Sequence, residues 1–496
     1  MPTASSSGPF NPSLAPGLAS LRKVLDEAGY LVNRLGATGV IPTGNVVLPK
    51  AEILVRLNGL GKFETLARLL AMGDVLPRQV ADDALAPLGC APLLACGLLH
   101  EEGSNVRAEA ALVPVAHLLM LRDLHGNMLG GTVRDDHVLG VGLSSLAVNE
   151  LTPRRSIAKA LDIGTGQGIQ AIGAATHAKS VVATDVNTRA LRFAEMNAAL
   201  AGCTNIDFRL GSFLEPVKGE EGTFDLIASN PPFVIRPPDN VVGFSAGLVG
   251  DSAVEHLVRE SPKFLAEGGY AVFLANWHHT NEQDWSARPR QWLAASGCDA
   301  WLIQFQVRSP KDYALHWIRE VTESEDADLT ELDRWTAYYD SLKIGAISFG
   351  AFLMRKRTGD NWLREDAIPK EMRRGAAGHQ IINIFENETV LRSRRPEDLL
   401  KLKLRAAPGI LAGKTETLAQ DGWKALAHDI SHRQGFIMPL AVDDALCDLL
   451  ASCDGTKPAA DVIASMAIKS GVNRAFALTH GAQAVAHLMK AGYLIA

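Results

Sequence analysis

The central part of the chain alternates apolar, β-branched segments with segments of helical periodicity. The apolar segments read SIAKALDIG, SVVATDV, IDFRLGSFL, FDLIAS, YAVFLANW, WLIQFQV and AISFGAFLMRKR. Their hydrophobic residues are continuous, which is typical of parallel strands buried on both faces. Helices are predicted between them at about 169–178, 188–201, 252–266 and 284–296. The last apolar segment has no long predicted helix directly before it, so it is expected to pair antiparallel. The pattern predicts a doubly wound α/β domain of about seven strands, with its crevice at the strands' carboxyl ends.

The flanking parts of the chain read differently. From about Ser20 to Leu121 the pattern is mostly helical, with helices predicted in FETLARLLAMGD, PRQVADDALAPLG and APLLACGLLHEEG, the last closed by Gly103. A hairpin is predicted in SNVRAEAALVP. Three helices and a hairpin are the order of a winged-helix unit.

Helices return near the C-terminus, and this end also reads as a small winged-helix fold. Asp454 is predicted to cap a helix start, and Val485, Leu488 and Met489 form an apolar stripe before Gly492. The chain thus divides into a tail over 1–19, a helical, winged-helix-like domain over 20–130, the α/β domain over 131–357, and a C-terminal domain over 358–496 with a winged-helix-like end.

Composition narrows the functional classes. The chain has 496 residues, of which 47% are hydrophobic and 21% charged, as in soluble globular proteins. The N-terminal segment lacks the basic residues and apolar run of a signal peptide, so a cytoplasmic location without a membrane partner is expected. The six cysteines form neither a CxxC pair nor a Cys/His cluster at zinc spacing, so buried thiols and no metal site are expected.

The first candidate site is a glycine-rich turn after a predicted strand. It reads Asp162-Ile-Gly164-Thr-Gly166-Gln-Gly168, and Asp185 ends the next predicted strand. Such glycines let the backbone turn tightly against a ligand at a helix N-terminus, and Asp185 lies where a carboxylate can accept both ribose hydroxyls. By itself this arrangement fits a dinucleotide-binding protein as well as any other protein that binds an adenosine-type cofactor.

The second candidate site separates these possibilities. The strand FDLIAS ends in Asn230-Pro231-Pro232-Phe233. The two prolines remove backbone donors, which leaves the Asn230 side-chain oxygen and the Pro231 carbonyl as fixed acceptors for the two hydrogens of an amine. Phe233 can stack on the planar group that carries this amine. A nicotinamide-dependent oxidoreductase would leave these residues unexplained.

With these motifs, the segment 155–357 resembles a class I S-adenosylmethionine-dependent methyltransferase of the branch that methylates planar nitrogens. DIGTGQG is similar to that family's motif I, ATDVN to its acidic strand end, and NPPF to its catalytic motif. The resemblance implies a Rossmann-like, seven-stranded fold and S-adenosylmethionine as cofactor. It implies that the catalytic residues are Asn230, Pro231, Pro232 and Phe233. The residues implied to bind the cofactor are Asp162, Gly164, Gly166, Gly168, Asp185, Asn187, Ser212, Phe213 and Asn230.

Three segments either depart from the family's pattern or leave two interpretations open. The family places an acid after strand 3 to bind the adenine, but this chain has Ser212 and Phe213 there. His137, in the segment 135–145, is either part of a cofactor-covering loop or a surface histidine. The segment 244–251 resembles the glycine-rich loop of glutamine-amide methyltransferases without its full pattern.

A further cluster ends the YAVFLANW strand. Trp277, His278 and His279 either line the substrate entrance or form a core tryptophan with an exposed histidine pair.

The family's motif serves three kinds of acceptor: adenine N6, guanine N2 and protein glutamine N5. Nucleic acid is favoured as partner, because both flanks look winged-helix-like and residues 355–496 hold 20 Lys and Arg against 16 Asp and Glu. The basic residues in question are Arg373, Arg374, Arg392, Arg394, Arg395, Lys401, Lys403 and Arg405. A protein glutamine is the alternative, and a cofactor-sensing regulator without catalysis is a third possibility. The layout also resembles a bacterial family of uncharacterised methyltransferases with flanking domains.

Overall fold

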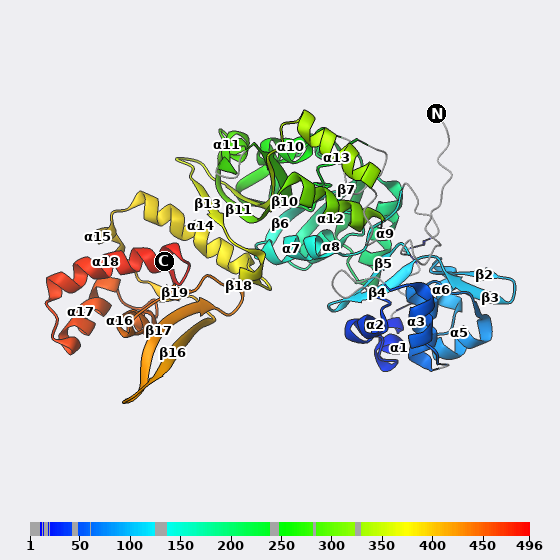
Figure 1. Cartoon of the computed structure of the whole chain (residues 1–496), viewed down its shortest axis with the longest axis horizontal. Coiled ribbons are helices and arrows are strands. Elements are labelled where there is room, and N and C mark those ends of the chain that lie inside the picture. Colours follow the sequence, from blue (N-terminus) through cyan, green and yellow to red (C-terminus); the bar gives the residue numbers. More distant parts are fainter. Residues whose placement is uncertain are drawn as a thin grey trace. The chain divides into compact units, whose positions relative to one another are not determined.

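A computed structural model shows the fold of the chain (Figure 1). The structure describes residues 10–11, 13, 18, 20–41, 48–59, 61–124, 136–238, 248–280, 284–322 and 329–496. These residues divide into two compact units. The first comprises Met1–Val148, Ser156–Gly297 and Val307–Thr358, and the second comprises Asn149–Arg155, Cys298–Gln306 and Gly359–Ala496. No helix in the described ranges is both long enough and apolar enough to cross a bilayer.

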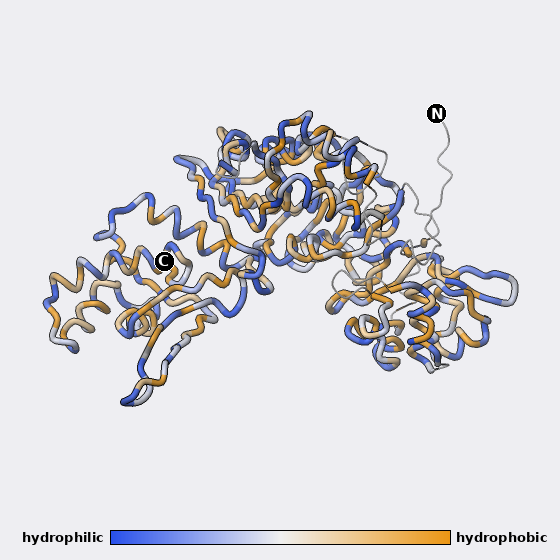
Figure 2. Tube along the Cα trace, viewed as in Figure 1, coloured by the Kyte–Doolittle hydropathy of each residue, from blue (hydrophilic) through white to orange (hydrophobic). Residues whose placement is uncertain are grey.

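The largest sheet has eight strands in the order β13-β11-β12-β10-β9-β6-β7-β8. Their bounds are β6 Ile157–Ile163, β7 Ala178–Asp185, β8 Ile206–Leu210, β9 Phe224–Ser229, β10 Leu265–His279, β11 Cys298–Arg308, β12 Ala346–Lys356 and β13 Leu363–Ala367. Strands β6 to β9 are parallel, β10 runs parallel to β9, and β12 pairs antiparallel with β10, as predicted. Apolar residues dominate the inner strands, as Figure 2 shows.

The helices of this α/β part begin and end close to the predicted positions, with some exceptions. They are α7 Leu143–Leu151, α8 Ile169–Ala175, α9 Thr188–Leu200, α10 Ser252–Glu260, α11 Ala287–Leu293, α12 Pro310–Thr322 and α13 Leu329–Ser341. The helix predicted over 252–266 is shorter, because a 3-10 turn over Ser261–Lys263 leads directly into β10. Helices α12 and α13 were not predicted, and α13 lies directly before β12. The antiparallel pairing of β12 was therefore predicted correctly, but the reason given for it, the lack of a long helix before this strand, is wrong.

The N-terminal elements share a hydrophobic core with α9 of the same unit. They are α1 Leu21–Glu27, α2 Val32–Thr38, α3 Lys50–Arg56, α4 Lys62–Leu66 with a π-helical continuation to Ala71, β1 Leu76–Pro77, α5 Arg78–Leu85, α6 Ala91–Ala95, β2 Leu99–Glu102, β3 Asn105–Ala108, β4 Ala111–Val115 and β5 Leu118–Arg122. Strands β1, β3 and β2 form one antiparallel sheet. Gly103 (φ 65°) turns the β2–β3 hairpin and does not close a helix, which corrects the prediction.

The second unit continues with helices and small sheets. Its further elements are β14 Arg373–Arg374, α14 Gly378–Ser393, α15 Pro396–Leu399, β15 Arg405–Ala406, β16 Ile410–Ala419, β17 Gly422–His432, β18 Gly435–Phe436, β19 Leu440–Ala441, α16 Asp444–Ser452, α17 Ala459–Ser470, α18 Arg474–Lys490 and β20 Leu494–Ile495. The predicted stripe of Val485, Leu488 and Met489 is fully buried. Asp454 does not cap a helix: its carboxylate accepts hydrogen bonds from Thr456 in a local turn, and α17 begins later.

Candidate functional site

The strand register brings both candidate sites to one edge of the sheet. On neighbouring parallel strands, Ile163 of β6 lies opposite Thr184 of β7 on one side and opposite Ser229 of β9 on the other. The residues that follow each of these strands therefore lie side by side. The glycine turn, Asp185 and Asn230 all leave the carboxyl ends of adjacent strands, where open α/β sheets bind ligands.

The glycine turn requires glycine for two separate reasons. Gly164, Gly166 and Gly168 have φ angles of 67°, 55° and 92°, in the left-handed region that glycine adopts without strain. In addition, a Cβ on Gly168 would lie 3.1 Å from the Cβ of Ala194, so the turn packs closely against α9. The turn is also tied to the next strand, because the backbone N–H of Thr165 donates to the Thr184 carbonyl at 2.9 Å.

Asp162 is buried beneath this turn with one oxygen unsatisfied. Its Oδ2 accepts hydrogen bonds from Thr165 Oγ1 at 2.7 Å and from the Ala171 N–H at 3.0 Å. Its Oδ1 is buried and has no hydrogen-bond partner within the described ranges. Burial raises the pKa of Asp162 to about 7, because the low-dielectric surroundings disfavour the carboxylate. A cationic group of a ligand at Oδ1 would supply the missing partner.

Asp185 is oriented by backbone donors on both sides. Its Oδ2 accepts from the Gly166 N–H at 2.8 Å, and its Oδ1 accepts from the Asn187 N–H at 2.8 Å. Burial raises its pKa, against the lowering effect of these bonds. Each carboxylate oxygen keeps a further lone pair, so the group can still accept bonds from two neighbouring hydroxyls.

Asn187 has a structural role in this geometry. Its Oδ1 accepts from the Arg189 and Ala190 N–H groups as the N-cap of α9, and its Nδ2 donates to the Asp136 carbonyl. The α9 cap is therefore Asn187, and Asp185 remains available to a ligand.

Ser212 and Phe213 follow β8 and lie next to Asp185. The Gly211 N–H donates to the Asp185 carbonyl at 3.0 Å, and Thr184 Oγ1 donates to the Phe213 carbonyl at 3.4 Å. Phe213 has a φ of 48°, which is unusual for a residue with a side chain. The structure therefore brings Ser212 and Phe213 together with the glycine turn and Asp185.

Asn230 has a specific hydrogen-bonding arrangement. Its Nδ2 donates to the hydroxyl oxygens of Ser144 and Ser145, each at 3.2 Å, at the start of α7. Its Oδ1 is buried and has no hydrogen-bond partner among the residues that the structure describes. A buried acceptor without a partner is costly, so a ligand N–H at this position would be stabilising. The two serines were not predicted, since a Ser-Ser pair carries no signal of its own in the sequence.

Aromatic residues surround the end of the NPPF segment. Phe233 is 8% exposed, and its ring centroid lies 6.4 Å from that of Trp317 and 5.9 Å from that of Phe349. The segment is held two residues later by α12 and α13. The Ile235 N–H donates to Tyr313 Oη at 3.1 Å, and Tyr339 Oη donates to the Ile235 carbonyl at 2.9 Å. These tyrosines were also missed, because their helices were not predicted.

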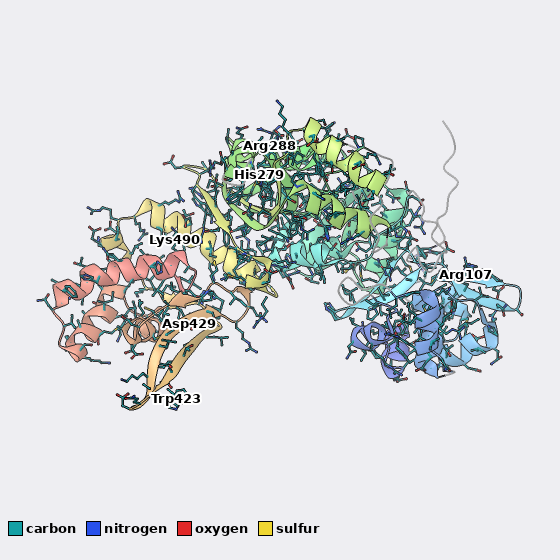
Figure 3. All side chains as sticks on the ribbon, viewed as in Figure 1. Arg107, His279, Arg288, Trp423, Asp429 and Lys490 are labelled. Carbon is teal, nitrogen blue, oxygen red and sulfur yellow. The ribbon has the colours of Figure 1, made fainter. Side chains whose placement is uncertain are left out.

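The remaining predicted candidates have other environments. Trp277 is fully buried and its Nε1 donates to the Trp285 carbonyl, so it belongs to the core. His278 and His279, the latter labelled in Figure 3, are both largely buried, which makes the expected exposed pair wrong. Burial and the nearby Arg288 lower the pKa of His278 to about 4, so this imidazole is neutral near pH 7.

Two predicted loops are described only in part. His137 is not a surface histidine, because its side chain is 16% exposed and lies 3.7 Å from a carboxylate oxygen of Asp123. Asp135 and residues 244–247 of the predicted glycine-rich loop lie outside the described residues. Asp251, at the end of that loop, accepts bonds from the His278 N–H and from Arg288.

Comparison with known proteins identifies this arrangement. Residues 142–287, which contain the glycine turn, Asp185 and Asn230, match the family model of the methyltransferase small domain. This segment is a class I S-adenosylmethionine-dependent methyltransferase domain. The predicted methyltransferase fold, enzyme class and cofactor are thereby confirmed, and the sheet has one strand more, β13, than the seven predicted. Residues 50–109 and 383–496 match two models that are each described as a domain of unknown function (DUF7059 and DUF7782).

Several curated relatives of the methyltransferase domain share one description. The release factor glutamine methyltransferase of Neisseria gonorrhoeae is 27% identical over 247 residues, which cover 45% of this chain and 80% of that protein. Its counterpart in Deinococcus radiodurans is 35% identical over 187 residues, 33% of this chain and 63% of that protein. The one in Xylella fastidiosa strain 9a5c is 33% identical over 131 residues, 23% of this chain and 46% of that protein. The chain thus spans about half to two thirds of the length of some of the relatives it matches.

Proposed function

We propose that this protein transfers the methyl group of S-adenosylmethionine to the side-chain amide nitrogen of a glutamine in another protein. The observation that carries the proposal is the buried Oδ1 of Asn230, which has no hydrogen-bond partner in the part of the chain that the structure describes and lies next to the glycine turn of a methyltransferase domain. The relatives named as release factor glutamine methyltransferases favour a glutamine amide among the planar amino groups that this geometry could accept.

The cofactor-binding roles follow from the same contacts. Asp162 Oδ1 would accept a hydrogen bond from the cofactor's ammonium group, and Asp185 would accept the ribose hydroxyls. Gly164, Gly166 and Gly168 would allow the close approach of the methionine part, and Asn187 would position Asp185 by capping α9. Ser212 and Phe213 would contact the adenine, the first by hydrogen bonding and the second by packing.

The catalytic step requires placement more than acid–base chemistry. S-adenosylmethionine supplies, when bound, an electrophilic methyl group on a sulfonium that is a good leaving group. Asn230 Oδ1 and the Pro231 carbonyl would accept the two N–H bonds of the amide, so that the nitrogen lone pair is directed at the methyl carbon. The N–C bond forms as the C–S bond breaks, and the nitrogen then loses a proton. Because the nitrogen gains positive charge, both hydrogen bonds strengthen in the transition state.

A nucleic-acid base remains the second candidate acceptor. The helix, strand, two helices and β2–β3 hairpin of residues 62–108 follow the order of a winged-helix unit, which supports it. The basic residues of the C-terminal part give it less support. Arg392 pairs with Glu388, Arg395 and Lys401 pair with Asp398, and Arg373 pairs with Glu150. Nearby carboxylates therefore neutralise several of these cations, which reduces the positive charge available to bind phosphate groups.

Methyl transfer from labelled cofactor tests the proposal. The full chain is incubated with S-adenosylmethionine carrying a tritiated methyl group and with, in separate reactions, a purified bacterial release factor, total RNA or DNA. Label that protease releases and nuclease does not, on a peptide whose glutamine gains the mass of one methylene, is the expected result. Label released by nuclease alone would favour the base as acceptor. An Asn230→Ala variant that binds S-adenosylhomocysteine normally and still methylates at the full rate would overturn the catalytic assignment.

A further inference from the structure

The β16–β17 hairpin is the most exposed regular element of the second unit. In Figure 1 it extends away from α16, α17 and α18 of the same unit. Every residue from Leu411 to Leu418 is exposed. The hairpin is anchored in its lower half, where Ile430 is buried, Tyr493 Oη donates to the Ile430 carbonyl, and β19 pairs with Asp429 and Ile430. The His428 carbonyl accepts from the Val442 N–H, and the His428 Nδ1 lies 3.2 Å from a carboxylate oxygen of Asp444 in α16.

The tip of this hairpin carries large apolar side chains. Leu418 and Trp423 are direct cross-strand partners, and their side chains are 68% and 67% exposed. Figure 3 shows Trp423 at the tip and Asp429 closer to the base. A two-stranded hairpin is marginally stable in water by itself, and contiguous exposed apolar side chains are a feature of surfaces that bind a partner.

The outer edge of β16 pairs with none of the strands that the structure describes. In its sheet the order is β16-β17-β19, so one side of β16 presents backbone N–H and C=O groups to which no described strand is bonded. Such an edge is a template for the addition of another strand.

The sequence of β16 is complementary to itself in one antiparallel register. Lys414 and Glu416 flank Thr415, and neither has an ion-pair partner within the ranges that the structure describes. If two copies of β16 pair antiparallel about Thr415, Lys414 of each copy lies opposite Glu416 of the other. Twofold registers centred on Lys414 or on Glu416 would instead place like charges opposite each other, which is unfavourable.

The same register also covers the apolar tip. It places Leu418 opposite Ala412 of the second copy, and Ala412 is the cross-strand partner of the buried Ile430. Apolar side chains would then form a row across the four strands: Trp423 and Leu418 of one copy, followed by Ala412 and Ile430 of the second copy. A twofold axis repeats this row on the other side of the charged pairs, as an isologous interface requires.

We propose that β16 is the dimerisation strand of this protein and pairs with β16 of a second copy about Thr415. The two hairpins then form one four-stranded antiparallel sheet. The charged pairs set the register, the backbone bonds of the two edges join the strands, and the Leu418–Trp423 pairs supply the apolar contact.

Charge variants of the full chain test this register by sedimentation velocity. The wild-type chain is expected to sediment as a dimer. Lys414→Glu places four carboxylates at the centre and Glu416→Lys places four ammonium groups there, so each variant is expected to weaken the dimer by about tenfold or more. An equimolar mixture of the two variants restores opposite charges at both positions and should regain the dimer as a heterodimer. The double variant K414E/E416K should regain it alone.

Controls separate this interface from general effects of charge. Lys469→Glu, at an exposed position of α17, is the matched control and should leave the dimer intact. Unchanged S-adenosylhomocysteine binding shows that the methyltransferase domain of each variant is folded, and recovery of the dimer by the mixture and by the double variant shows that the hairpin is. A monomeric wild-type chain, a dimer that Lys414→Glu does not weaken, or a mixture that stays monomeric would each overturn the proposal.

Discussion

Asn230 Nδ2 donates a hydrogen bond to Ser144 Oγ at 3.2 Å, across the junction between β9 and α7. Ser145 Oγ accepts the second amide proton at the same distance. With both N–H bonds used, the buried Oδ1 is the one atom of this amide that can still accept a hydrogen bond from a ligand. The serine pair thus determines that the Oδ1 end of the amide faces the substrate. A substrate N–H group that donates a hydrogen bond is preferred there over a carbonyl or hydroxyl oxygen that would have to accept one.

We therefore expect the Ser144→Ala/Ser145→Ala double variant to lose orientation of Asn230. The amide could then rotate and present its NH₂ end, so kcat should fall roughly tenfold to hundredfold, while the affinity for S-adenosylhomocysteine stays unchanged. Steady-state kinetics and calorimetry measure the two quantities separately.

The same serine replacements in an Asn230→Asp background show whether the serines act by orienting the residue 230 side chain or by packing against it. In Asn230→Asp, both side-chain oxygens are acceptors, so rotation no longer exposes a donor. The same double serine replacement should then cost much less kcat than it does with Asn230. Equal losses in the two backgrounds would show that the serines act through packing alone.

Substitutions of Asp185 are expected to weaken cofactor binding. Asp185→Ala removes the ribose acceptors and also the bond that orients the Gly166 N–H, so the dissociation constant for S-adenosylhomocysteine should rise roughly tenfold to hundredfold. Asp185→Asn keeps one acceptor oxygen and should bind with intermediate affinity. Calorimetry gives both values, and a ranking in which Asn binds as weakly as Ala would contradict a role for the carboxylate oxygens.

The glycine turn, Asp185 and NPPF could be located from sequence because their chemistry depends on local order along the chain. Each follows a continuous apolar strand, and parallel strands necessarily place their carboxyl ends together. The antiparallel pairing of the last strand was predicted correctly but for a reason that the structure does not support, because α13 directly precedes β12.

Other parts depend on contacts between distant segments and left no such signal. Ser144 reaches Asn230 from 86 positions away, and Tyr313 reaches Ile235 from 78 positions away. Strand β13, with the charged sequence LREDA, pairs at the sheet edge through its backbone, and no apolar pattern marks it.

The buried Asp162 predicts a pH dependence of cofactor binding. Its pKa of about 7 lies above the ordinary value of 3.8, so below pH 7 the free protein holds a proton on this group. A cofactor ammonium at Oδ1 favours the carboxylate, and binding then releases that proton. Affinity for S-adenosylhomocysteine should therefore increase as pH rises towards about 7, by up to about tenfold per pH unit, and then level off.

The control for this dependence is Asp162→Asn, which keeps an oxygen for Thr165 and Ala171 but has no titrating carboxyl. Its affinity should be lower near pH 7 and nearly independent of pH below that value. Calorimetry in two buffers of different ionisation enthalpy counts the released protons. No proton release by the wild-type chain at about pH 6 would count against this placement of the ammonium.

Tyr313 connects stability to catalysis. Its hydroxyl oxygen accepts from the Ile235 N–H at 3.1 Å and from Asn276 Nδ2 at 2.7 Å, and all three residues are buried. Tyr313→Phe leaves both donors unsatisfied, so the free energy of unfolding should fall by about 1–3 kcal/mol in urea titrations. Because Ile235 lies two residues after Phe233, kcat should also fall.

Tyr338→Phe is the matched control, since it removes a single bond to the Gly250 N–H at a position that is only partly buried. Water can replace that bond, so the loss of stability should be clearly smaller. Equal losses in the two variants would mean that the Tyr313 bonds to Ile235 and Asn276 contribute nothing beyond an ordinary tyrosine hydroxyl. A Tyr313→Phe variant with reduced stability but unchanged kcat would show that the NPPF segment keeps its geometry without this support.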